Sequence, residues 1–195
     1  MNLFRTLGAV ALLALGWAGT SSCLKAPDFP LEPTITFNSL KKTYEAPRMP
    51  GATPADTLEF AIDFQDGDGD LGLDADDAAI PPYNSPTGGH NNLSTSNNYF
   101  IQPFKRVISG GIPTFVPFYT PGGFPGEYDG RYPRLETTTD AKPAPLKGTL
   151  RYKLRLPLNR TSYSANDVLR FEISIMDRAM HQSNAVTTTE VTLGP

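Results

Sequence analysis

The chain has 195 residues, with 17 lysine and arginine residues against 20 aspartate and glutamate residues, and its formal net charge is -3 at neutral pH. This mild acidity argues against a nucleic-acid-binding protein, which would need a basic face. The single cysteine leaves no possibility of a disulfide within the chain, so the fold must depend on its hydrophobic core.

The N-terminal residues predict a bacterial export signal. A short segment that carries Arg5 precedes an apolar run from Leu7 to Ala18, and this run is shorter than the roughly 20 residues that a transmembrane helix needs. Two serines then lead directly into Cys23, where lipoprotein signals place the cysteine that becomes acylated. We therefore expect residues 1–22 to be a lipoprotein signal peptide and Cys23 to carry lipid. The alternative is cleavage by the ordinary signal peptidase, because Thr20 stands where lipoprotein signals usually carry leucine.

Residues 23–33 hold three prolines and little that could pack, which predicts an extended tether between the lipid and the domain. Residues 34–195 are expected to form a single domain with no amphipathic helix of ordinary length. Four of its segments have the alternation or composition of β-strands: Thr57–Phe64, Thr149–Leu156, Val168–Asp177 and Ala185–Leu193. Such short strands, separated by Pro, Gly and Asn clusters, predict an all-β fold, an antiparallel immunoglobulin-like β-sandwich.

A long insertion, about residues 78–147, separates the first two of these strands. It is rich in proline, glycine and asparagine but also in aromatic residues, which a disordered linker would contain only rarely. We expect Tyr99–Val107 and Ile112–Tyr119 to form further strands. The aromatic side chains of this insertion are also candidates for a surface that binds a glycan or a protein partner.

An acidic stretch, Asp63–Asp77, holds seven carboxylates and no lysine or arginine. Calcium takes about six to eight oxygen ligands on a flexible backbone, and three of these aspartates alternate with glycine. If Asp66 is counted as position 1 of a calcium-binding loop, Asp74 and Asp77 fall at positions 9 and 12. The candidate calcium ligands are therefore Asp66, Asp68, Asp70, Asp74 and Asp77. A solvated acidic turn without an ion is the alternative.

This spacing resembles the DxDxD loops of EF-hand, dockerin-like and thrombospondin type-3 calcium repeats in part. Those loops carry glycine at position 6, where this chain has Leu71, with Gly72 one place late. A predicted strand leads into the stretch where an EF-hand has a helix. An EF-hand proper is therefore excluded.

A second resemblance covers more of the chain. The sequences FQDGDGDLG (residues 64–72) and DRAMHQSN (residues 177–184), the lipoprotein cysteine and a PDFP tether resemble a group of uncharacterised Bacteroidetes-type outer-membrane lipoproteins. In that group an F-x-DGDGD-I/L-G turn and a DRA-x-N-x-SN hairpin recur in one sandwich domain; His181 stands where the hairpin usually has asparagine. The resemblance implies outer-membrane attachment and an immunoglobulin-like or cadherin-like sandwich, but no activity. If both motifs lie at the same end of the sandwich, Asp177 would offer the ion another oxygen.

The sequence gives little support to catalysis. It contains two histidines, His90 and His181, and neither a G-x-S-x-G nor an HExxH motif. The only thiol is expected to be acylated. We therefore expect a non-catalytic envelope lipoprotein, attached to the membrane through its lipid, with structural calcium in the acidic turn. The alternative is a surface module that binds a glycan or an envelope protein through the aromatic residues of the insertion.

Overall fold

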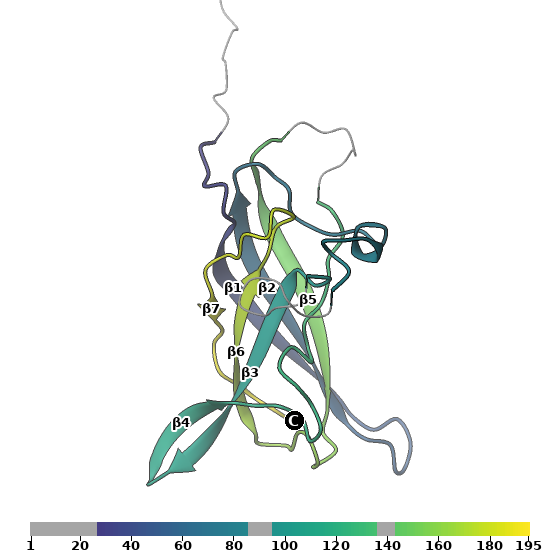
Figure 1. The fold of residues 1–195 in the computed structure, drawn as a ribbon. Coiled ribbons are helices and arrows are strands. Elements are labelled where there is room, and N and C mark those ends of the chain that lie inside the picture. The colour runs from purple at the N-terminus through teal and green to yellow at the C-terminus, as the bar shows by residue number, and fades with distance from the viewer. Residues whose placement is uncertain (1–26, 86–94, 136–142) are drawn as a thin grey trace, which may run out of the picture.

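The computed structural model describes residues 27–85, 95–135 and 143–195, so the expected signal peptide, Cys23 and His90 lie outside the described residues. The described chain is built almost entirely from β-strands, joined by loops and one short 3-10 helix, Asp77–Ala79 (Figure 1). The strands are β1 (Thr34–Glu45), β2 (Ala55–Asp66), β3 (Tyr99–Ser109), β4 (Ile112–Pro117), β5 (Leu146–Pro157), β6 (Val168–Ile175), β7 (Val186–Thr187) and β8 (Val191–Thr192). None of the helices in this part of the chain is long and apolar enough to cross a membrane.

The strands form two antiparallel sheets that pack against each other. One sheet has the order β1-β2-β5, and the other has the order β4-β3-β6-β7, with β8 also paired to β6. In Figure 1 the two layers lie face to face along most of their length, and the hairpin of β3 and β4 extends from one end. The prediction of an all-β antiparallel sandwich is confirmed.

The core lies between the sheets and is formed by side chains that the alternating sequence pattern predicted to face inward. The side chains that the pattern placed inward on β2 and β6 are buried: Leu58, Phe60, Ile62, Phe64, Leu169, Phe171, Ile173 and Ile175. The rings of Phe60 and Phe171 meet edge to face across the two sheets, with centroids 4.8 Å apart, a favoured geometry for an aromatic pair. This packing holds β2 and β6 close to each other.

The sequence did not reveal β1, which pairs with β2 along almost its whole length. The register shifts between Phe37 and Ser39, and a bulge of this kind moves the following side chains to the opposite face. Ile35 is buried before the bulge, and Leu40 and Tyr44 pack against the core after it. The apolar period therefore changes in the middle of the strand, which hides it from a period-2 pattern.

Both strands expected within the long insertion are present. β3 covers Tyr99–Val107 and pairs with β6 on one side and with β4 on the other. Much of this region is therefore an integral part of the second sheet. β4 is an edge strand that contains Pro113 and ends at Pro117, and edge strands tolerate proline because one side needs no backbone donor.

The expected final strand, Ala185–Leu193, is wrong as a single element. The structure has two short strands there, and the chain from Thr187 to Val191 spans one more residue than the chain of β6 opposite it. The Thr188 hydroxyl accepts a hydrogen bond from the Phe171 amide at 3.0 Å, and the Thr188 amide donates to the Phe171 carbonyl at 2.9 Å. A side chain thus replaces a backbone partner, and the extra residue forms a bulge that interrupts the ladder.

Candidate metal centre

The two sequence motifs of the acidic turn and the C-terminal hairpin meet at one end of the sandwich. Asp66 is the last residue of β2, and Asp177 follows the end of β6. The turn after β2 reaches the hairpin through an isolated antiparallel bridge between Leu71 and Asp177. The Ala179 amide also donates to Asp70 Oδ2 at 3.0 Å. The expected proximity of the two motifs is confirmed.

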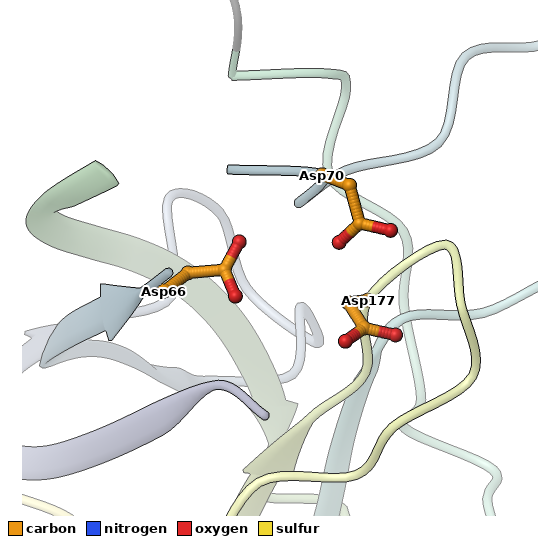
Figure 2. A group of neighbouring side chains, drawn as sticks. All are labelled: Asp66, Asp70 and Asp177. Atoms are coloured by element: carbon orange, nitrogen blue, oxygen red, sulfur yellow. The ribbon is translucent and has the colours of Figure 1, made fainter. Parts of the chain in front are cut away.

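Three carboxylates converge where these loops meet. Asp66, Asp70 and Asp177, called the acidic cluster below, each offer an oxygen, and these oxygens lie within 4.8 Å of one another. In Figure 2 the three side chains extend toward a common space from the end of β2, the turn after it and the loop after β6. A set of carboxylate oxygens at this spacing has the dimensions of a binding site for one cation.

Asp66 is the most unusual member of the cluster. Its exposed fraction is 0%, and within the described residues no donor meets the geometry of a hydrogen bond to either of its carboxylate oxygens, although the Gly69 amide has a small lowering effect on its pKa. One buried oxygen of Asp70 and one of Asp68 also have none. Buried carboxylates are nearly always hydrogen-bonded or paired with a positive charge, because burying a charge alone is costly. These oxygens therefore point to a ligand that the described residues do not supply.

The pKa values of the cluster also show that ionised carboxylates are unfavourable at this position. Burial is the main cause that raises the pKa of Asp66 to about 7, and the charges of Asp68, Asp70 and Asp177 add to the rise, while the Gly69 amide offsets part of it. Burial, then Asp177 and Asp68, raise the pKa of Asp70 to about 6, against a smaller opposing effect of Arg178. Like charges in a buried site oppose ionisation, and a divalent cation would remove that opposition.

His181 holds the carboxylate of Asp177 in place. The His181 amide donates to Asp177 Oδ1 at 2.7 Å, and its ring Nδ1 lies 2.9 Å from Oδ2. The charge of Asp177 raises the pKa of His181, while burial chiefly raises that of Asp177 itself. A carboxylate oxygen has more than one acceptor site, so these contacts orient Asp177 and still leave it able to bind an ion.

Two of the five aspartates predicted as ligands lie elsewhere. Arg134 donates from Nε to Asp77 Oδ2 at 2.8 Å and forms a second bond from Nη2 to Oδ1, and its backbone amide donates to Asp74 Oδ1 at 3.3 Å. The bond from Arg134 is the main cause that lowers the pKa of Asp77 to about 2. Asp74 and Asp77 are therefore neutralised by an arginine and not grouped with Asp66 and Asp70, which the spacing had placed in the same frame.

The glycines of the turn explain how other segments reach it. Gly69 has φ of +73°, a left-handed conformation that favours glycine, and a β-carbon there would collide with the Ala144 carbonyl oxygen. The Ala144 amide donates to the Asp68 carbonyl at 3.0 Å. The segment before β5 thus lies directly on the turn, which keeps Asp68 beside the acidic cluster.

Tyr132 is a site residue that sequence reasoning missed. Its hydroxyl is buried without a hydrogen-bond partner in the described part of the chain. Burial chiefly raises its pKa, and the charges of Asp66, Asp177 and Asp70 contribute, which couples this hydroxyl electrostatically to the acidic cluster. A lone tyrosine in a loop rich in glycine and proline carries no spacing signal that could have identified it.

Comparisons with known proteins do not add to this geometry. No protein-family model matches the chain, and no curated protein matches it. A solved chain described as the X-ray structure of Northeast Structural Genomics Consortium target SoR45 has 7% identity, covers 83% of this chain and 87% of its own length, and gives a TM-score of 0.30. Because this score is too low to indicate a common fold, the interpretation of the site depends on its own residues.

Proposed function

We propose that this chain is a non-catalytic, lipid-anchored protein of the cell envelope whose sandwich binds a divalent cation, calcium, as part of its structure. Asp66 carries the cation proposal, because its fully buried carboxylate has no hydrogen-bond partner among the residues that the structure describes and lies beside two other carboxylates. A buried charge without a partner strongly destabilises the folded state. A bound cation would supply the missing partner.

The donor set favours calcium over other metals. The acidic cluster and Asp68 offer carboxylate oxygens, which suit hard cations such as calcium and magnesium. Calcium accepts many protein oxygens in irregular geometry, whereas magnesium retains several of its waters and requires a near-octahedral arrangement. A glycine-containing turn that supplies three of the four carboxylates fits the first description better.

The role of the ion would be structural. The acidic cluster takes two members from the turn after β2 and one from the loop after β6. These segments are far apart in the sequence and carry charges of the same sign. Calcium would replace their repulsion by a common attraction and would join the two sheets at this end.

Thermal unfolding with and without calcium tests this proposal. We expect millimolar calcium to raise the melting temperature of the wild-type protein above its value in chelator, and Asp66→Asn to abolish the rise. Asp77→Asn is a matched control, because it makes the same charge change in the same stretch but at a carboxylate already paired with Arg134. An unchanged wild-type melting temperature at saturating calcium would refute structural cation binding.

The envelope location depends on the N-terminal sequence. Residues 1–22 have the composition of a lipoprotein signal and are followed directly by Cys23. We propose that Cys23 carries the lipid and that the protein is attached to the outer membrane. Labelling with radioactive palmitate, followed by membrane fractionation, should give a labelled outer-membrane protein, and Cys23→Ala should abolish the label. Cleavage without acylation would leave the wild type unlabelled.

A surface that binds a glycan or a protein through aromatic residues is the alternative. Tyr119 and Phe124 support it, because they are 39% and 64% exposed. Most aromatic residues of the same region do not, because Tyr99 and Phe100 are buried and Tyr128 packs against the core. A glycan array probed with the wild type and with Phe124→Ala tests this alternative, which requires a signal that the substitution weakens.

A further inference from the structure

The segment that precedes β1 lies against the acidic turn. Residues 27–33, called the linker below, pass beside the end of β2 (Figure 1). A β-carbon added to Gly67 would lie 2.5 Å from the Phe29 carbonyl oxygen and 2.7 Å from that of Pro30. Real side chains do not approach a backbone oxygen so closely. Glycine between Asp66 and Asp68 therefore allows the linker to lie directly on the turn.

The first residues of β1, which follow this segment directly, are also held by the loop that carries Asp177. The Asn184 side chain accepts a hydrogen bond from the Ile35 amide at 2.9 Å and donates one to the Ile35 carbonyl at 2.9 Å, as a neighbouring strand would. The chain around the start of β1 therefore contacts both loops that form the acidic cluster, through Phe29 and Pro30 at Gly67 and through Ile35 at Asn184.

The position of one loop relative to the other depends on the acidic cluster. Short backbone contacts join them, such as the Leu71–Asp177 bridge, but the carboxylates at their junction repel one another. A cation would hold the two loops in the arrangement that fits the linker. Without it, we expect the turn and the hairpin to separate more often, and each separation would break either the contact of the linker with Gly67 or that of Ile35 with Asn184.

We propose that binding of a divalent cation at the acidic cluster fastens residues 29–33, which lead into β1, to the sandwich and so fixes the direction in which the chain leaves the domain toward its N-terminus. This inference rests on the proposed cation binding. In a lipid-anchored protein it would make the orientation of the domain relative to the membrane dependent on calcium. The linker would have a fixed orientation relative to the sandwich when the cation is bound and would be free to reorient when it is absent.

Hydrogen exchange measured by mass spectrometry on the full mature chain tests the proposal. We expect calcium to slow exchange in peptides that cover residues 28–36, by up to about a hundredfold at roughly one hundred times its dissociation constant if docking and binding are fully coupled. Peptides from β4 serve as the internal reference, because this strand lies at the far end of the molecule (Figure 1). Their exchange should not change.

Two variants separate linker docking from cation binding. Gly67→Ala obstructs the linker and Asn184→Ala removes the two hydrogen bonds to Ile35 at the start of β1, while both leave every carboxylate in place. Each should lose the calcium-dependent protection of residues 28–36. Because coupling is reciprocal, calorimetry should show a calcium affinity that is lower by no more than the factor by which calcium slows exchange in the wild type. Asn184→Ala provides the test by itself if Gly67→Ala does not fold.

The possible failures are distinguishable. If the wild type binds calcium but exchange in residues 28–36 does not respond, linker docking is overturned and cation binding stands. If both variants retain the calcium-dependent protection, the contacts at Gly67 and Asn184 do not fasten the linker, and the proposal is overturned as well. If calorimetry detects no calcium binding to the wild type, the proposed function and this inference both fail.

Discussion

Leu71 and Asp177 form a single antiparallel bridge that joins the turn after β2 to the loop after β6. The Arg178 amide donates to the Asp70 carbonyl next to it, at 3.3 Å. These contacts bring the three carboxylates of the acidic cluster together from two distant parts of the sequence. The candidate site is therefore a product of the sandwich topology and not of one calcium-binding loop.

Asp66→Asn should change the stability of the calcium-free and the calcium-bound protein in opposite directions. In chelator, the substitution removes a buried carboxylate that has no hydrogen-bond partner among the described residues, so we expect the free energy of unfolding to rise by about 1–2 kcal/mol. In calcium, the variant should be less stable than the wild type, because it loses a ligand. Denaturant unfolding under both conditions measures the difference. A variant that is destabilised in chelator as well would show that Asp66 has a stabilising partner within the chain.

The pH dependence of the calcium-free protein follows from the same carboxylates. The folded-state pKa values of Asp66 and Asp70, about 7 and about 6, lie above their ordinary value of 3.8. Between about pH 4 and pH 7 the folded state then binds more protons than the unfolded state, so stability in chelator should fall as the pH rises through this window. Unfolding curves at several pH values measure the slope, and the Asp66→Asn and Asp70→Asn double variant should show a smaller one. Calcium should remove the decline, because it binds the deprotonated carboxylates.

The ion pair of Asp77 and Arg134 should have the opposite effect on the pH dependence of stability. Arg134 lowers the pKa of Asp77 to about 2, so the contribution of Asp77 is present above about pH 4 and is lost as the pH falls through 2. Asp77→Asn should reduce the free energy of unfolding at neutral pH by about 1–2 kcal/mol, as measured in urea. Its affinity for calcium should match that of the wild type, and a large loss would place Asp77 among the ligands.

The packing between the sheets can be tested at Phe60. Its side chain is fully buried and meets Phe171 edge to face, so Phe60→Ala should lower the free energy of unfolding by about 3–5 kcal/mol. Phe124→Ala is the control, because that ring is 64% exposed and its removal should have little effect. Equal losses in the two variants would contradict the described core.

The strands could be predicted from the sequence where one face of the strand is uniformly buried. β2 and β6 have an uninterrupted period of two, and the aromatic residues of the region before β5 correctly indicated β3 and β4. β1 was missed because the bulge after Phe37 changes its period. The final strand was predicted too long because the Thr188 side chain, and not the backbone, pairs with Phe171. Local sequence patterns do not reveal bulges or side-chain hydrogen bonds that depend on a neighbouring strand.

The candidate site shows the same limit. The glycine-separated aspartates predicted Asp66 and Asp70 as ligands and the resemblance of two motifs pointed to Asp177, and the structure brings these three carboxylates together. Spacing alone also selected Asp74 and Asp77, because a linear frame cannot show that Arg134, from a distant segment, lies beside them. Tyr132 had no signal in the sequence. Charge neutralisation is a property of the folded molecule, so the candidate ligands could be distinguished from the aspartates paired with Arg134 only in three dimensions.

Isothermal titration of the chelator-treated protein with calcium tests the central claim most directly. We predict that the wild type binds calcium in a single-site isotherm, that Asp77→Asn binds with similar affinity, and that Asp66→Asn shows no measurable binding. Magnesium should bind more weakly than calcium. Absence of calcium binding to the wild type, or equal binding by Asp66→Asn, would contradict the assignment of the acidic cluster as a cation site.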